Sequence, residues 1–178
     1  MKKTILFACI MLLNIQLFSQ KAAVLDNDDI IIWSAARLLT WNDFKKVKNK
    51  KEDVQKKAIS SIGLRFIAVY NQYKTCSFEV VPYFDKKHSR ITAKRSELLL
   101  KHEQYHFNIA ELLARKFREH QDTLDQEKLE KNEYELVINW YKRVYKSYQD
   151  NYDSATKHGA DVKNQKNWKR KLMLPCKV

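Results

Sequence analysis

The sequence predicts an α+β protein in which a small, mainly antiparallel sheet packs on two long helices. Two segments rich in β-branched and aromatic residues, 58–70 and 76–84, come first. Residues 92–174 contain no proline and one glycine, Gly159, and their apolar residues recur at steps of three and four. Strands that precede the helices, rather than alternate with them, are typical of the α+β class.

The region before the two main strands is expected to supply one short strand and one helical turn. Residues 30–33 form a short β-prone run. In the segment 38–44, Thr40 is placed to cap a short helical turn. The lysine-rich segment 45–57 has the composition of an exposed loop or a fraying helix.

The two main strands are expected to form a hairpin. Residues 58–70 and 76–84 show partial alternation of side-chain character, and residues 71–74 between them have turn composition. Proline has no N–H to donate to a sheet ladder. Pro82 therefore indicates that the second strand lies at an edge or ends there.

The rest of the chain is expected to be helical. One helix should run from about residue 93 to 121 and a second from about 128 to 157, followed by a short helix that includes Trp168. The second helix carries a stripe of mainly aromatic residues at helical spacing. Such a stripe predicts core packing rather than a cofactor site; its members are Tyr134, Val137, Tyr141, Val144, Tyr145, Tyr148 and Tyr152.

The N-terminus has the parts of a secretory signal. A basic start is followed by an apolar run over residues 5–18 and by the small residue Ser19. A membrane-spanning helix would need about 20 apolar residues, and Lys21 comes too early for that. We expect residues 1–20 to be a signal peptide and residues 21–178 to be a single domain exported to the periplasm or the extracellular space. The alternative is a buried N-terminal helix.

Two cysteines, Cys76 and Cys176, remain after removal of the signal. Because exported proteins meet an oxidising compartment, this even number predicts a disulfide between them. Their Cα atoms should then lie about 4.4–6.8 Å apart. The alternative is a pair of unpaired thiols.

The chain is strongly basic, with a formal net charge of +13, which loss of Lys2 and Lys3 would lower to +11. Export and the scattered placement of the lysines argue against a nucleic-acid partner. A solvated basic face is one interpretation. Attraction to an anionic envelope polymer or to lipid head groups at a membrane surface is the functional alternative.

The sequence His102-Glu103-Gln104-Tyr105-His106 carries the pattern H-E-x-x-H. On a helix, this spacing puts both imidazoles on one face, where they can bind a single Zn²⁺, and Glu103 lies on the same side. Neutral imidazoles bind zinc without cancelling its charge, and the metal lowers the pKa of a bound water. A glutamate beside that water can act as general base and then as general acid.

The two histidines should point into the protein. On a helical wheel, His102 and His106 share a sector with apolar residues such as Leu99 and Ile109, opposite Lys101 and other polar residues. An unpaired buried imidazole is costly. We expect the ring nitrogens to converge to within about 3–4 Å, as two ligands of one zinc must. The alternative is two hydrogen-bonded core histidines without a metal.

A third ligand must come from elsewhere in the chain, and His158 is the first candidate. Gly159 follows it, as expected where a helix ends in a left-handed residue, so His158 can project toward a neighbouring helix. Glu133 and Glu135 are the rival ligands. The alternative interpretation of His158 is an exposed histidine favoured by the helix dipole.

Three segments resemble one bacterial family, which is described as predicted secreted zinc-dependent proteases with a domain of unknown function. They are L-T-W-N-D-F over residues 39–44, L-K-H-E-Q-Y-H-F-N-I-A-E-L over 100–112 and Y-D-S-A-T-K-H-G over 152–159. The chain departs from the family pattern at Lys46, where glycine is expected, and at Arg90, where tryptophan is expected.

The resemblance implies a zincin-like domain with an active-site helix and a Zn²⁺ cofactor. His102 and His106 match the metal ligands, Glu103 matches the catalytic glutamate, and His158 matches the downstream histidine–glycine segment. The expected function is therefore that of an exported zinc metallopeptidase of the H-E-x-x-H type, a hydrolase acting on a peptide or protein substrate through metal-activated water. Tyr152 is a candidate to steady the oxyanion.

Two other functions are compatible with the same residues. One is a non-enzymatic envelope protein with a structural zinc site and a basic binding face. The other is an amidase that acts on cell-wall peptides. An open coordination position favours either enzyme, and a closed site with four ligands favours the structural protein.

Overall fold

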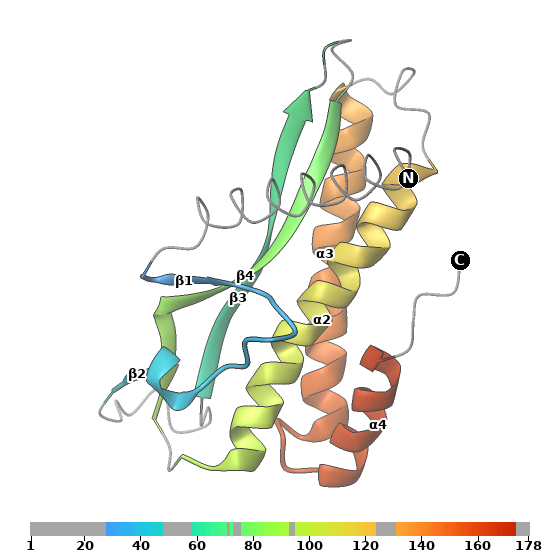
Figure 1. Ribbon diagram of the computed structural model, residues 1–178. Helices are drawn as coiled ribbons and strands as arrows, with labels where there is room; N and C mark the ends of the chain where they lie inside the picture. Colours follow the sequence, from blue (N-terminus) through green and yellow to red (C-terminus); the bar gives the residue numbers. More distant parts are fainter. Residues whose placement is uncertain are drawn as a thin grey trace, which may run out of the picture.

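A computed structural model describes residues 28–47, 58–70, 72, 76–92, 95–123 and 131–173 of the chain. The architecture is α+β, with a four-stranded mixed sheet on one side of three helices (Figure 1). In chain order the elements are β1 (Ile30–Ile32), the 3-10 helix η1 (Trp41–Asp43), β2 (Lys45–Lys46), β3 (Ala58–Tyr70), β4 (Cys76–Ile91), α2 (Glu97–Asp122), α3 (Lys131–Thr156) and α4 (Val162–Met173).

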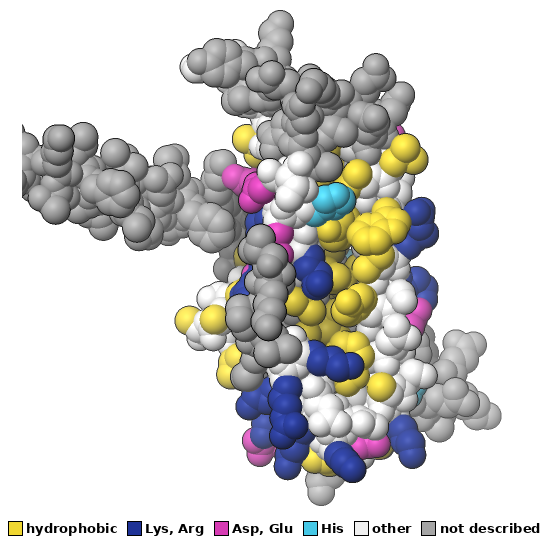
Figure 2. Space-filling model, turned by 90° about the vertical axis from the view of Figure 1, so that its right-hand side faces the viewer, with side chains coloured by type: hydrophobic (Ala, Val, Ile, Leu, Met, Phe, Trp, Pro, Cys, Tyr) yellow, Lys and Arg dark blue, Asp and Glu magenta, His cyan; other side chains and the backbone are white. Residues whose placement is uncertain are grey.

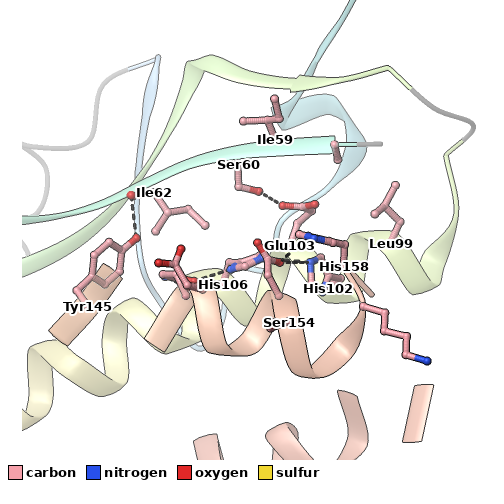
Figure 3. A pocket seen from close by; sticks show the side chains of 15 residues that line it. Ile59, Ser60, Ile62, Leu99, His102, Glu103, His106, Tyr145, Ser154 and His158 are labelled. Atoms are coloured by element: carbon pink, nitrogen blue, oxygen red, sulfur yellow. Dashed lines mark hydrogen bonds and ion pairs between the residues drawn. The ribbon is translucent and has the colours of Figure 1, made fainter. Parts of the chain in front are cut away.

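Strand β4 organises the sheet because every other strand pairs with it. β1 and β3 are antiparallel to β4, and β2 is parallel to it. The predicted hairpin of β3 and β4 is confirmed by their continuous pairing from Tyr70↔Cys76 to Ser61↔Asp85. A register shift follows, since Ile59 pairs with Arg90. The irregularity lies beside Ser60, whose side chain points out of the sheet toward α2 (Figure 3).

The prediction that the second strand lies at an edge or ends at Pro82 is wrong. β4 continues to Ile91, with strands on both sides. The carbonyl of Pro82 accepts a hydrogen bond from the Trp33 N–H on the β1 side, at 3.1 Å. In an antiparallel strand the nitrogen and carbonyl of one residue face the same side. The proline nitrogen therefore faces the side where β1 ends and removes no bond from the ladder with β3.

The segment before β3 is also partly different from the prediction. Lys45 and Lys46 form an exposed parallel strand instead of a loop or helix, because they pair with Arg90 and Ile91 at the end of β4. This pairing partner is far away in the sequence, so local composition gives no sign of it. Residues 48–57 lie outside the described part of the chain.

The helices are confirmed with small shifts at their ends. α2 begins at Glu97, later than expected, because the side chain of Ser96 accepts a hydrogen bond from Leu99 N–H at 3.2 Å and caps the helix. α4 contains Trp168, as predicted. The stripe on α3 is core, as predicted: Tyr134, Tyr141 and Tyr152 are buried, and Val137, Val144, Tyr145 and Tyr148 are partly buried.

Helix α2 lies at the centre of the packing. It contributes buried residues to each of the three apolar clusters. The first cluster also contains residues from β1, η1 and β4, the second contains residues from β3, β4 and α3, and the third contains residues from α3 and α4. One face of the helical layer shows a band of apolar side chains flanked by lysine and arginine (Figure 2). α4, at the lower end of this layer in Figure 1, exposes Lys163, Lys166, Lys169, Arg170 and Lys171.

Several sequence predictions concern residues outside the described part. The signal peptide over residues 1–20 and the partner Cys176 of the disulfide are among them, and the side chain of Cys76 is not described either. Export and the disulfide therefore stay predictions. Across the described helices, none has the length and apolarity to cross a membrane.

A small polar cluster holds η1 in place beside the sheet. The buried carboxylate of Asp43 accepts two hydrogen bonds from the Arg37 guanidinium, at 2.7 and 3.1 Å. It also accepts bonds from the Thr40 N–H at 2.7 Å and the Thr40 hydroxyl at 3.0 Å. Thr40 occupies the N-cap position of η1, as expected. Burial alone would raise the pKa of Asp43, but the bonds from Arg37 and Thr40 outweigh it and hold the pKa below its usual value.

This cluster predicts a pH-dependent stability difference. Asp43→Asn should lower the free energy of unfolding at pH 7 by about 1–3 kcal/mol, because it removes charged hydrogen bonds. Since the pKa of Asp43 is depressed in the folded state, its stabilisation is complete above the usual carboxyl value of 3.8 and is lost as the pH falls below it. Urea unfolding of both proteins at pH 7, 5 and 3 should show the difference shrinking only at pH 3. A difference independent of pH would contradict the assignment.

Candidate metal centre

Helix α2 presents His102, Glu103 and His106 toward the space between β3 and α3 (Figure 3). His102 and Glu103 are buried, with exposed fractions of 3% and 4%. His106 retains a side-chain exposure of 13%. The inward direction predicted from the helical wheel is therefore confirmed.

The two imidazoles meet through their Nε2 atoms. These atoms lie 3.1 Å apart, which confirms the predicted convergence. The rings are nearly perpendicular, with an angle of 84° between their planes. The helical spacing of four residues thus brings two ring nitrogens to one point without any break in α2.

Asp153 on α3 completes the cluster. Its Oδ1 atom lies 3.0 Å from Nε2 of His102 and 2.9 Å from Nε2 of His106. Among the described residues, these three form the one group of histidine, cysteine or acidic side chains close enough to hold a metal ion. Asp153 lies in the segment 152–159 that carries the family resemblance, but the sequence did not identify it as a metal ligand.

The arrangement of His106 fits a metal ligand. Gln149 of α3 makes two contacts with His106. Its Nε2 donates to the His106 carbonyl at 3.0 Å, and its Oε1 contacts His106 Nδ1. The amide oxygen can only accept, so Nδ1 carries the proton, and Nε2 of the neutral ring presents a lone pair. That lone pair faces the carboxylate of Asp153. Such a contact requires a shared cation or proton.

The distances also fit a tetrahedral ion. Two ligands at about 2.0–2.1 Å from such an ion lie about 3.3–3.4 Å from each other. The three distances in the cluster are 2.9, 3.0 and 3.1 Å. A shift of a few tenths of an ångström would therefore admit the ion.

The electrostatics of the cluster favour a positive charge at its centre. Burial alone would raise the pKa of Asp153, but the hydrogen bonds and positive charges that the two histidines provide when protonated outweigh it and lower the pKa well below its usual range. Burial alone would lower the pKa of His106. The hydrogen bond to Asp153 and the charges of Glu103 and Asp153 outweigh it and raise that pKa. Both directions therefore favour a positive charge at the point where the three side chains meet.

Tyr152 supports the histidines from behind. Its ring stacks on His102, with centroids 4.8 Å apart, and meets His106 edge-on at 4.9 Å. The side chain is fully buried and does not line the cleft. The suggestion that Tyr152 steadies an oxyanion is therefore wrong, because its hydroxyl does not face the space where a substrate would bind.

A cleft of about 670 Å³ opens beside the cluster. The start of β3 forms one wall, through Ile59, Ser60 and Ile62, and α2 and α3 form the others (Figure 3). The Ser60 hydroxyl donates to Oε2 of Glu103. The Tyr145 hydroxyl donates to the Ile62 carbonyl at 2.8 Å, which ties α3 to β3. Glu103 and the three converging atoms thus share one cleft.

The predicted third ligand, His158, lies at the mouth of this cleft. Its side chain is 75% exposed, and its Nδ1 is 3.4 Å from Oδ1 of Asp153. It does not join the close group of His102, His106 and Asp153. Glu135, one rival ligand, is exposed and does not line the cleft, and the side chain of Glu133 is not described.

The loop after α3 explains the direction of His158. Lys157 and His158 adopt left-handed backbone angles, with φ of 50° and 51°, and Gly159 follows with φ of 82°. The sequence predicted a left-handed end at Gly159, but the turn begins two residues earlier and swings His158 outward. Gly159 also packs on His102: a Cβ atom there would lie 2.9 Å from Cγ of the imidazole.

This contact predicts that Gly159→Ala damages the site from outside the cleft. The new methyl group meets the His102 ring and a left-handed backbone, so the variant should lose about 1–3 kcal/mol of stability. It should also bind divalent metal more weakly, because His102 must move. Thermal unfolding and metal titration measure the two effects. Lys157→Gly is the matched control in the same turn: it removes a strained side chain and should not lower stability. Equal metal binding by Gly159→Ala and the wild type would contradict the contact.

No family model, curated protein or solved structure matches this chain. The functional feature that the geometry provides is a candidate metal-binding group of His102, His106 and Asp153.

Proposed function

We propose that this protein is an exported zinc-dependent hydrolase that cleaves peptide or amide bonds. The observation that carries the proposal is the convergence of two imidazole nitrogens and one carboxylate oxygen within 3.1 Å, in a cleft that also contains a buried glutamate. The resemblance of residues 100–112 and 152–159 to secreted zinc-dependent proteases supports the same activity.

His102, His106 and Asp153 would hold the ion through Nε2, Nε2 and Oδ1. A zinc ion bound there supplies Lewis acidity, which polarises a substrate carbonyl and lowers the pKa of water. Imidazole and carboxylate ligands also suit iron and manganese. Metal analysis of the purified protein therefore identifies the ion.

Glu103 is the residue to which we assign proton transfer. The Ser60 hydroxyl occupies Oε2 and fixes the carboxylate in the cleft. We assign Oε1 as the base: it takes a proton from the attacking water as the water oxygen bonds to the carbonyl carbon. The same proton then passes to the amide nitrogen as the C–N bond breaks. Atoms and charge balance without any further reactant.

The position of His158 distinguishes the proposed enzyme from its structural alternative. In an enzyme the fourth coordination position stays open to the cleft, whereas four protein ligands close a structural site. The 75% exposure of His158, outside the converging group, supports an open position. Movement of His158 onto the ion would instead support a structural zinc site in an envelope protein, with the exposed lysines of α4 binding an anionic polymer or membrane surface.

The proposed substrate is a peptide or a protein. A peptide or protein substrate fits a cleft with one wall formed by a strand, and an amidase acting on cell-wall peptides is the close alternative. Incubation of the mature protein with a peptide library and with cell-wall fragments, followed by mass spectrometry, separates the two activities.

Metal binding tests the ligand set. The wild type should bind one zinc ion per chain in calorimetric titration. Asp153→Asn should weaken binding by about 100-fold or more, because it removes the only charged ligand. Asp150→Asn is a matched control, since Asp150 lines the same cleft but lies outside the group, and this variant should bind zinc as the wild type does.

Glu103→Gln should keep zinc and lower hydrolysis by about 100-fold or more. Unchanged hydrolysis by Glu103→Gln would overturn the assigned role.

The role of His158 has its own test. His158→Ala should change zinc affinity by less than about tenfold, as expected for a residue outside the ligand set. The measurement is competition with a chromophoric chelator. A loss as large as that of Asp153→Asn would establish His158 as a ligand and favour the structural site.

A further inference from the structure

Three buried polar side chains in the described part of the chain have an atom without a hydrogen-bond partner, and one of them is the candidate ligand His102. Within the described residues, Nδ1 of His102, the Tyr152 hydroxyl and Oε1 of Gln165 are the buried side-chain atoms that lack a hydrogen-bond partner. The side chains are 3%, 0% and 3% exposed, respectively. Buried polar atoms are rarely left unpaired in proteins. Because one of the three belongs to a candidate ligand, the contacts that connect these side chains bear on the metal centre.

Helix α4 contacts the surroundings of His102 at two places. The Tyr152 ring stacks on His102 at 4.8 Å and meets Trp168 of α4 edge-on at 5.4 Å. Gln165 lies one turn before Trp168, and its Nε2 donates to the Leu98 carbonyl at 3.3 Å. Leu98 is one turn before His102 in α2, so its carbonyl lies next to the His102 backbone. The amide of Gln165 is thus held beside the base of His102.

The absence of a side chain on Gly159 leaves room beside the His102 ring. A Cβ atom on this residue would lie 3.3 Å from Nδ1 of His102, 2.9 Å from its Cγ and 3.0 Å from its Cβ. The edge of the imidazole that carries Nδ1 therefore faces the turn that leads into α4. Gln165 reaches α2 from that helix.

The chemistry of the three atoms is complementary. If Nε2 of His102 faces the ion, Nδ1 carries the ring proton and must donate it. The Tyr152 hydroxyl is also a donor, and Oε1 of Gln165 is an acceptor. His106 already shows the same pattern, because its Nδ1 contacts Oε1 of Gln149.

We propose that Gln165 is a positioning residue for His102, so that each histidine of the centre has a glutamine acceptor behind it. Its Oε1 receives the Nδ1 proton of His102, either directly or through one water molecule that the Tyr152 hydroxyl shares. This bond holds the imidazole in the tautomer whose Nε2 lone pair faces the ion. The proposal rests on the proposed metal centre and makes α4 part of it.

The test compares full mature chains that carry Gln165→Leu, Gln165→Glu or Asn167→Leu. Leucine removes the acceptor at similar size, glutamate keeps an acceptor, and Asn167 is an exposed amide on the same helix that serves as the control. Zinc affinity of Gln165→Leu should fall about 10- to 100-fold, as for other outer-shell partners, with Asn167→Leu unchanged and Gln165→Glu close to the wild type.

Nitrogen-15 labelling of the histidines adds a readout that a purely structural role would not change. In the zinc-loaded wild type, the imidazole protons of both His102 and His106 should exchange slowly with solvent. In Gln165→Leu only that of His106 should do so. Should this variant not fold, rapid exchange of the His102 proton in the wild type would itself overturn the proposal.

The outcomes distinguish the metal centre from the role of Gln165. Failure of the wild type to bind zinc would overturn the proposed metal centre. Zinc binding by the wild type, with equal affinity and slow exchange of both protons in Gln165→Leu, would overturn only the role of Gln165.

Discussion

Two imidazole nitrogens and one carboxylate oxygen within 3.1 Å of each other are the constraint on which the rest of the structure depends. At that distance, unprotonated atoms repel through their lone pairs, so the cluster requires a proton or a cation at its centre. The low exposure of the two imidazoles strengthens this requirement, because burial weakens the screening of charge by water. When neither a proton nor a cation lies between these atoms, the fold must hold them together against their repulsion.

The surrounding elements provide that restraint from several directions. Gln149 fixes the tautomer of His106, Tyr152 packs beneath both imidazoles, and Gly159 closes on the edge of His102. These residues come from α3 and the turn that follows it, whereas the histidines come from α2. The antiparallel packing of α2 and α3, with α4 against both, is thus what builds the centre. The start of β3 adds the wall that places Ser60 against Glu103.

The features that sequence reasoning predicted are those with a local pattern. The periods of strands and helices identify β3, α2 and α3, and the spacing of four residues brings His102 and His106 together. The end of β4, residues 85–91, lacks such a pattern because charged residues replace the apolar alternation, and its pairing with β2 and β3 decides its structure. Asp153 was missed for a similar reason. Its role comes from the packing of α3 on α2, and no spacing within α3 reveals it.

The most direct test of the candidate metal centre is X-ray absorption spectroscopy of the zinc-loaded protein. A centre of His102, His106 and Asp153 should give a first shell of nitrogen and oxygen atoms at about 2.0–2.1 Å, with outer-shell scattering from two imidazoles and none from sulfur. Scattering from three imidazoles would contradict the ligand set of His102, His106 and Asp153, because it would bring His158 onto the ion. A sulfur shell at about 2.3 Å would mean that zinc binds elsewhere, through cysteine, and would contradict the centre itself.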